Sequence, residues 1–435
     1  MKRICLALPT DRPCGEAISA LGEEAAYAAD RFGVEVLLLV LDSCPPREYA
    51  KHAAVVRALP PHPSVVAHHL DEAAQRDFLK RAIEETRTQA PEVLLDLMLP
   101  DAVSYGACTN RAFLIAAGLG CTSVHRRDSD SRYQKRDGET LYPVHHELLS
   151  IGKPVAQAAA AVTSTDPVTG GSDWAVALVG ASFIGELSVD LGEMHALAPE
   201  IYREVVGLWA PPHRTEREKD ELVAESFRGA GHTPFTEDRS VLTVVDPMRV
   251  DMCNIAFHGV HEHVPLPPCT DTIGSDYFLI HLVQKSGLPG VLHNRHIENF
   301  HTAERRTDAG FTAYQTRFAK FLLSMHYLHP LYDAMARAGS GLLDDGGRPR
   351  PDVIATLARA CARLDPSDNH RRLDVLTAAY RRLGGRYAGI AAHLAGRQDV
   401  LLAQARRDME DFALLTEAWR PLVRAARSSS PGVFA

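Results

Sequence analysis

The sequence predicts an α/β fold with a mostly parallel sheet flanked by helices, followed by a C-terminal helical region. Two apolar runs, Arg3 to Leu8 and Val34 to Leu41, enclose residues 16–31, where apolar side chains recur at helical spacing. A strand, a helix and a strand in that order form a parallel unit. From residue 311 onward Ala, Leu and Arg recur with amphipathic helical spacing. We therefore expect a domain at 1–310 that contains the sheet and a helical region at 311–435.

Further elements follow from local patterns along the chain. The pair Gly118 and Gly120 is expected to end a helix, because glycine accepts the positive φ of a helix C-terminus. The pattern predicts helices at 72–87 and from residue 106, strands at Val93 to Met98, Cys121 to Val124, Asp173 to Val179 and Val241 to Val245, and a loop at Tyr142 to Ser150.

Composition excludes several classes of partner. The formal charge of −8 gives no basic footprint for nucleic acid. No stretch approaches the 18 or so apolar residues of a membrane span. The apolar run at the start of the chain is too short for a signal peptide. The eight cysteines contain no CxxC and suit reduced thiols. The sequence thus predicts a cytoplasmic protein.

Two aspartates stand out after the predicted strand at 121–124. Asp128 and Asp130 are separated by one residue, so on an extended segment their side chains point the same way. They can share one hard divalent cation, and Mg²⁺ and Mn²⁺ prefer such oxygen ligands. The same triplet is also common in solvated turns.

The order of elements around this triplet resembles that of the GT-A glycosyltransferases. In that family a helix headed by Asn and Arg, a turn of small residues, a strand and a DXD loop form the sugar-nucleotide site. The resemblance implies that Asp128 and Asp130 hold Mn²⁺ or Mg²⁺ on the donor diphosphate, and that Asn110, Arg111 and Ser129 lie near the nucleotide. The sequence departs from the family where His125, Arg126 and Arg127 precede the first acid.

Residues after the first two strands are expected in the same crevice. Ligands of parallel sheets bind at the carboxyl ends of the strands. The family has a Pro-Thr loop after its first strand and a carboxylate after its second that contacts the base or ribose. By resemblance, Pro9, Thr10, Arg12 and Asp42 contact the nucleotide; Asp42 also suits a helix cap or turn.

Asp276 is the candidate catalytic residue. GT-A enzymes often carry an acidic residue at the head of a helix at this point, where it takes the acceptor's proton in inverting transfer. A carboxylate near a helix N-terminus is equally suited to capping and to the helix dipole. The resemblance therefore favours an inverting transferase with Asp276 as base.

Late histidines offer a further metal ligand. The family frequently ends its last strand with a histidine that completes the metal shell, and His293, after Val291 and Leu292, is the first choice. His296 and His301 are alternatives. A donor-covering loop follows in the family, and Arg305 is expected to meet phosphate there.

Other functions remain open from the residues alone. His258, His261 and His263 could serve a zinc-dependent hydrolase, although their spacing differs from HExxH. A nucleotidyltransferase would also use paired acids, and a non-catalytic sugar-nucleotide-binding protein could share the fold. His145, His146 and Glu147 could line an acceptor site or belong to the structure.

The resemblance also extends to donor and acceptor. The Ala- and Arg-rich chain is similar to the transferases of lincosamide antibiotic biosynthesis, which join a GDP-activated sugar to a small-molecule thiol such as ergothioneine. This implies a nucleotide-diphosphate sugar and a small-molecule acceptor, and a homodimer contact through the helical region is a further hypothesis. The metal hypothesis requires that Asp128 and Asp130 face the crevice without being held in ion pairs by arginines.

Overall fold

A nine-stranded sheet forms the centre of the computed structural model, which describes residues 1–435 except 169–170, 172, 212, 302–306 and 430–435. The order of its strands is β3-β2-β1-β4-β12-β9-β13-β11-β8. The strands are β1 (Arg3–Thr10), β2 (Glu35–Asp42), β3 (Val65–Leu70), β4 (Val124–Arg127), β8 (Ser164–Thr165), β9 (Leu178–Gly180), β11 (Ser240–Thr243), β12 (Asn254–Phe257) and β13 (Gly290–His293). Strands β3, β2, β1 and β4 are parallel, whereas β12 is antiparallel to both neighbours.

Helices cover both faces of this sheet, because alternate residues of its strands are buried on opposite sides. One face of β1, with Ile4 and Leu6, packs with side chains of α1 (Gly15–Phe32), α2 (Pro46–Ala58), α6 (Val144–Ser150) and α7 (Val155–Ala159). The other face, with Cys5 and Ala7, packs with α3 (Glu72–Thr86), α4 (Pro91–Met98) and α5 (Tyr105–Gly118). The predicted fold class is confirmed.

A smaller sheet joins distant parts of the chain beside the DSD triplet. Its order is β10 (Phe183–Gly185), β14 (Ile297–Asn299) and β5 (Ser131–Tyr133), and a hairpin of β6 (Lys135–Arg136) and β7 (Glu139–Thr140) follows β5. Asn299 pairs with Ser131, so β14 runs next to the residue that follows Asp130.

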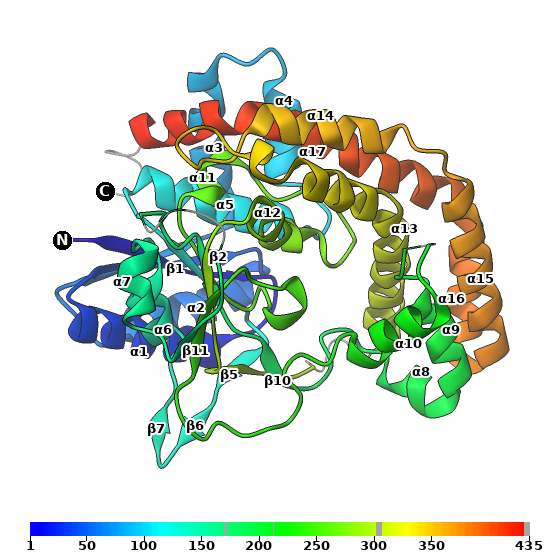
Figure 1. Cartoon of the computed structure of the whole chain (residues 1–435), viewed down its shortest axis with the longest axis horizontal. Helices are drawn as coiled ribbons and strands as arrows, with labels where there is room; N and C mark the ends of the chain where they lie inside the picture. Colours follow the sequence, from blue (N-terminus) through cyan, green and yellow to red (C-terminus); the bar gives the residue numbers. More distant parts are fainter. Residues whose placement is uncertain (169–170, 172, 212, 302–306, 430–435) are drawn as a thin grey trace.

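The middle of the chain contributes short helices that connect the sheet to the C-terminal region. They are α8 (Gly192–Leu197), α9 (Pro199–Gly207), α10 (Glu216–Glu225), α11 (Val260–His263) and α12 (Phe278–Ser286), with 3-10 turns η1 (Pro247–Arg249) and η2 (Ser275–Tyr277). In Figure 1, α8, α9 and α10 lie with the C-terminal helices, away from β1 and β2.

The C-terminal region is helical as predicted. It consists of α13 (Asp308–Ala338), η4 (Gly339–Leu342), α14 (Pro351–Ala362), α15 (Ser367–Leu383), α16 (Gly385–Gly396) and α17 (Gln398–Ser429). Helix α17 packs against α14 and also against α3 and α5 of the sheet-containing part (Figure 1). The Trp419 indole donates a hydrogen bond to the carbonyl oxygen of His261 at 2.8 Å. The division into domains near residue 310 stays a prediction.

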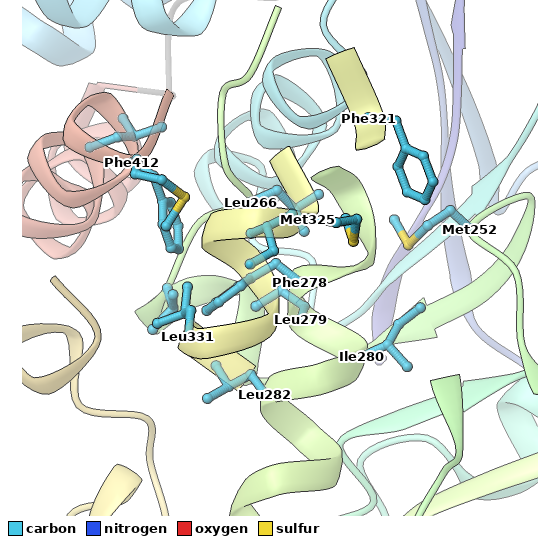
Figure 2. Close-up of a cluster of buried hydrophobic side chains, with 14 of the residues drawn as sticks. Met252, Leu266, Phe278, Leu279, Ile280, Leu282, Phe321, Met325, Leu331 and Phe412 are labelled. Atoms are coloured by element: carbon cyan, nitrogen blue, oxygen red, sulfur yellow. The ribbon is translucent and has the colours of Figure 1, made fainter. Parts of the chain in front are cut away.

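An apolar cluster joins α12 and α13 to α17. Phe278 is fully buried, and its ring lies 4.7 Å from that of Phe412. Figure 2 shows Phe278 and Leu279 among Leu266, Met325 and Leu331. This packing fixes the head of α12, where Asp276 lies.

Four expected elements are wrong or displaced. The strand expected at 173–179 is shorter and later, because β9 covers only Leu178–Gly180. Residues 93–98 form α4 rather than a strand, because Pro91 starts a helix that buries Leu94, Leu95 and Met98 on one side. The strand expected at 121–124 lies instead at Val124–Arg127, so its last three residues are the polar ones that precede Asp128. The loop expected at 142–150 is largely α6.

No helix in the described ranges has the length and apolar character that crossing a bilayer requires.

Candidate functional site

A cavity of about 960 Å³ opens at the carboxyl ends of β1, β4 and β9. Its wall includes the loop after β1, the DSD triplet after β4, Ser182 and Phe183 after β9, and residues of α10, α12 and α13. Its volume lies within the usual range for small-molecule sites. The cavity therefore lies where parallel sheets bind ligands.

Asp128, Ser129 and Asp130 all line this cavity, as predicted. Asp128 Oδ1 lies 3.0 Å from Arg126 Nη2, and Asp130 Oδ2 lies 3.0 Å from Arg12 Nη1. The first condition of the metal hypothesis is met, because both side chains reach the crevice. The second is not met, since each aspartate forms an ion pair with an arginine.

The two arginines do not balance the negative charge at this point. Asp276 lies 3.7 Å from Arg126 and Asp251 accepts a hydrogen bond from the Tyr277 hydroxyl, so these two carboxylates face the same cavity as Asp128. Burial raises the pKa of Asp128 to about 7; Arg126 opposes the rise, and the charges of Asp130, Asp251 and Asp276 add to it. The four carboxylates thus form a site that favours additional positive charge.

Arg126 itself is buried and incompletely paired. It lines the cavity with 3% of its surface exposed, and neither Nε nor Nη1 has a hydrogen-bond partner among the described residues. The neighbouring residue, Arg127, points to the other face of β4, where Glu24 and Glu147 hold it through four hydrogen bonds of 2.8 to 3.1 Å. Alternation along the strand separates the two guanidinium groups.

Sequence reasoning missed Arg126, Asp251 and Tyr277. The basic residues before Asp128 were noted only as a departure from the family pattern. A strand that contains His, Arg and Arg must bury them against acids, so the arginines themselves signalled nearby carboxylates. No local pattern marks Asp251.

The Pro9–Arg12 loop enters the cavity as expected. Pro9, Thr10 and Arg12 line it, and the Thr10 hydroxyl donates to the carbonyl oxygen of Arg12 at 2.9 Å. Arg111 lines the cavity as well, but its Nε and Nη1 donate to Gln75 and to the Met98 carbonyl at 2.7 Å. Arg111 therefore stabilises the wall.

Asn110 does not line the cavity. Its amide donates to the carbonyl oxygen of Leu266 and accepts from the Leu266 N–H, both at 2.8 Å. This pair of hydrogen bonds joins α5 to the segment before α12. The geometry gives Asn110 a structural position rather than a contact with ligand.

Asp42 also lies outside the cavity lining, although Leu41 and Ser43 belong to it. Its Oδ2 accepts hydrogen bonds of 2.8 Å from His52 Nδ1 and from His69 Nε2. These three residues are a possible metal group by distance. However, His52 Nε2 accepts the Cys14 N–H at 3.0 Å, so the proton of neutral His52 is on Nδ1. The nitrogen that faces Asp42 is therefore a donor, and the group is a hydrogen-bond network.

The late histidines are not brought together with the aspartates. His293 ends β13, which is three strands from β4 in the sheet, about 14 Å at normal strand spacing. Its ring stacks on that of His146 at 5.3 Å. Strand β14, rather than β13, returns to the triplet, and the Phe300 N–H donates to the Asp130 carbonyl at 3.3 Å. His301 follows, but its Nε2 lies 2.8 Å from the Leu187 carbonyl oxygen.

Two other predicted site residues, His296 and Arg305, do not support the prediction. His296 is mostly buried, and burial lowers its pKa. His296 does not belong to the cavity lining. Arg305 lies outside the described residues.

The histidines at 258–263 do not converge. His258 Nδ1 lies 2.7 Å from the Thr122 carbonyl oxygen, His261 packs against Phe113, and His263 accepts from Arg420. In the described part of the chain no metal-binding group includes them. The geometry does not favour the zinc hydrolase.

The group at 145–147 belongs to the structure rather than to an acceptor wall. Glu147 is fully buried with Arg127 and His125, and His146 Nε2 lies 2.9 Å from Asp238 Oδ1. His145 Nδ1 lies 2.6 Å from the Tyr27 hydroxyl.

The fold and the site together define an α/β protein with a carboxylate-rich ligand cavity at the ends of its parallel strands. The chain belongs to a family of unknown function, DUF6271, whose model matches residues 2–433. Comparison with curated proteins finds no match. Among solved structures, the chain is similar to the mannosyltransferase PcManGT from Pyrobaculum calidifontis in complex with GDP-Man and Mn²⁺, with 13% identity, a TM-score of 0.35, and coverage of 98% of this chain and 86% of that chain. A likeness of this level carries no argument about activity.

Proposed function

We propose that the chain is a metal-dependent glycosyltransferase that uses a nucleotide-diphosphate sugar. The observation that carries the proposal is the group of four carboxylates, Asp128, Asp130, Asp251 and Asp276, at the strand ends of a large cavity. Burial and mutual repulsion raise the pKa of Asp128 to about 7 despite Arg126. Such a site gains free energy from a divalent cation.

The donor atoms suit Mn²⁺ or Mg²⁺, but Asp128 and Asp130 would have to leave Arg126 and Arg12 to hold the ion. Among the described residues, the four carboxylates do not already converge at ligand distance. Asp128 and Asp130 offer oxygen donors, which hard divalent cations prefer, and they stand one residue apart at the cavity wall. A cation held there would supply neutralisation of the diphosphate leaving group. His293 is not part of this proposal, because it stacks on His146 away from the cavity.

Arg12 and Arg126 are proposed to contact phosphate. Both guanidinium groups lie within 3.0 Å of the aspartates that would hold the cation. Arg126 has two nitrogens without hydrogen-bond partners among the residues described. Arginine forms strong hydrogen bonds with phosphate oxygens. Asp128 and Asp130 would then exchange arginine for metal, while Arg126 and Arg12 would exchange aspartate for phosphate.

Asp276 is proposed as the base that accepts the acceptor's proton, which favours inversion. It lines the cavity, and burial raises its pKa, with Arg126 opposing and Asp251 adding to the rise. A base whose pKa approaches the working pH is more effective. If the acceptor is a thiol, as the sequence resemblance implies, the base is needed less, because thiols ionise near neutrality.

Pro9, Thr10 and Ser129 are proposed to contact the nucleotide or the sugar, since they line the same part of the cavity. GDP is the first nucleotide to test because the resemblance includes enzymes that use GDP-sugars. A role in natural-product biosynthesis, a cytoplasmic location and a homodimer remain predictions.

Thermal unfolding in the presence of UDP, GDP, dTDP or ADP, with and without Mn²⁺, tests the proposal. A bound ligand raises the unfolding temperature according to RT ln(1 + [L]/Kd). We expect one nucleotide to stabilise the protein, and more so with Mn²⁺. Asp130→Ala should lose the effect of Mn²⁺ while remaining folded.

Asp101→Asn is a matched control, because Asp101 is exposed and lines the cavity without an ion pair in the described ranges. It should keep the full response to Mn²⁺. Stabilisation by every nucleotide alike, or a response to Mn²⁺ that persists in Asp130→Ala, would refute the proposed metal site. Binding of the nucleotide without any turnover of its sugar esters would instead indicate a non-catalytic binding protein.

A further inference from the structure

The cavity has a second wall, remote in sequence from the DSD triplet, that is aromatic. Trp209 and Phe227 line it and are stacked, with ring centroids 5.2 Å apart and planes at 17°. Phe321 of α13 lies edge-on to Trp209 at 5.6 Å. Figure 2 shows Phe321 above Met252 at the edge of the apolar cluster. Stacked aromatic rings at a cavity wall offer π faces to a ligand.

Helix α10 presents acidic residues to the same cavity. Glu218, Glu221, Leu222 and Glu225 line it, and their spacing places them on one side of the helix. Three of these four residues are glutamates, and Glu221 and Glu225 are exposed to solvent where they line the cavity. They therefore add negative charge to this side of the cavity.

Basic residues do not offset this charge. Arg214 pairs with Glu218 at 2.7 Å and balances that residue alone. Lys285 also lines the cavity on this side, and Arg217 pairs with Glu221 at 3.6 Å. The remaining lining carboxylates here are Glu225, Asp246 and Asp333. Neither Glu225 nor Asp333 forms an ion pair within the described ranges.

The histidines of this wall add no positive charge at neutral pH. His281 and His329 line the cavity, and burial lowers the pKa of each to about 3, with nearby cationic groups acting in the same direction. The Nδ1 atom of each is buried without a hydrogen-bond partner in the part of the chain that is described. Both rings are therefore uncharged at neutral pH.

We propose that the wall formed by Trp209, Phe227, Phe321, Glu221, Glu225 and Asp333 binds the acceptor, and that the acceptor is an organic cation, a protonated amine or a quaternary ammonium. The term acceptor rests on the proposed transferase function; the preference for a cation does not. Aromatic faces attract cations, above all the face of tryptophan. The carboxylates of Glu225 and Asp333, which form no ion pair among the described residues, attract a cation and repel an anion.

Collisional quenching of Trp209 fluorescence measures the charge of this wall without any knowledge of the ligand. Trp419 is fully buried, and Trp174 can be replaced by phenylalanine, which leaves Trp209 as the accessible tryptophan. Each ion's quenching constant is divided by that of neutral acrylamide, at an equal ionic strength of about 0.05 M. The resulting value for caesium should be at least threefold larger than that for iodide.

The double variant Glu221→Gln and Glu225→Gln should reduce that ratio toward one. Glu200→Gln is the matched control, because Glu200 is an exposed glutamate outside the cavity lining. It should leave the ratio unchanged. Equal quenching by the two ions, or better quenching by iodide, would overturn the proposal.

Calorimetric titration with choline and with its neutral isostere 3,3-dimethylbutan-1-ol tests recognition directly. We expect choline to bind about tenfold more tightly, and Trp209→Leu to abolish the difference. Equal binding, or binding of neither, overturns the inference and leaves the nucleotide result of the proposed function intact. A choline preference in a protein that binds no nucleotide would refute the transferase and keep the cation site.

Discussion

Asp128→Asn is predicted to stabilise the protein in the absence of metal and to abolish its response to Mn²⁺. The pKa of Asp128 is raised from 3.8 to about 7, first by burial and then by three nearby carboxylates, with Arg126 opposing. The native state therefore disfavours the charged form relative to the unfolded chain. Asparagine removes the charge and keeps the shape of the side chain.

The size of the effect follows from this difference in pKa. A rise of about 3 corresponds to about 4 kcal/mol, since each pKa unit equals about 1.4 kcal/mol. The side chain of Asp128 is 31% exposed, which weakens the interactions through solvent, so we expect about 2 kcal/mol. With an unfolding entropy of about 2.1 cal/mol/K per residue, the melting temperature should rise by about 2 °C.

The sign of the pH dependence provides the test. A carboxyl group with a raised pKa in the native state binds its proton more tightly there, so the stability that it contributes falls as pH rises from about 4 to about 7. The difference in melting temperature between Asp128→Asn and the parent should be small near pH 4 and largest at pH 8.

The assay is a series of thermal unfolding curves between pH 4.5 and 8.5, with EDTA and then with Mn²⁺. Manganese should reverse the order of stability at pH 8, because the parent gains a ligand and the variant does not. A variant that is less stable than the parent at pH 8 without metal would refute the reasoning. It would mean that the ion pair with Arg126 outweighs the repulsion among the acids.

Three further predictions concern other parts of the molecule. Asp276→Asn should slow sugar transfer by about 10² to 10⁴ while keeping the Mn²⁺-dependent binding of nucleotide, as measured by initial rates and calorimetry. His52→Ala removes one of the two histidine hydrogen bonds of buried Asp42, so urea unfolding should show a loss of about 1 to 3 kcal/mol. Zinc analysis of the parent should find no stoichiometric metal. Lys320→Met removes the ammonium group that lies 2.9 Å from the buried carboxylate of Asp408, so urea unfolding at pH 8 should show a loss of about 3 kcal/mol in stability. The loss should shrink near pH 5, because burial raises the pKa of Asp408 to about 6 and the carboxyl group is then protonated.

The sequence predicts the elements whose burial is one-sided or complete. Strands β1 and β2 and helix α1 differ from the predicted ranges by one or two residues, because uninterrupted apolar runs and helical spacing have few alternative structures. Residues 93–98 show the limit of that logic. A short apolar run suits a buried helix as well as a strand, and only Pro91 marks the helix.

The position of β4 shows a second limit. The predicted strand ended before His125 because polar residues rarely continue a buried strand. In the structure His125 and Arg127 are buried, but Glu147 and Glu24 compensate them. Pairing between residues so far apart in the chain leaves no local pattern.

The site was predictable where the sheet determines it and unpredictable where long-range pairing determines it. Pro9, Thr10, Asp128 and Asp130 line one cavity because parallel strands end at one edge. His293 was placed by analogy with the end of a last strand, and a later strand, β14, takes that place beside the triplet.

Helix α17 has a consequence for the order of folding during synthesis. It packs on α3 and α5, which are made some three hundred residues earlier, and Trp419 donates to the carbonyl of His261. The apolar surfaces of α3 and α5 therefore stay uncovered on the ribosome until the last helix emerges. At translation speeds of about 5 to 20 residues per second this interval lasts tens of seconds, long enough for chaperones to bind the nascent chain.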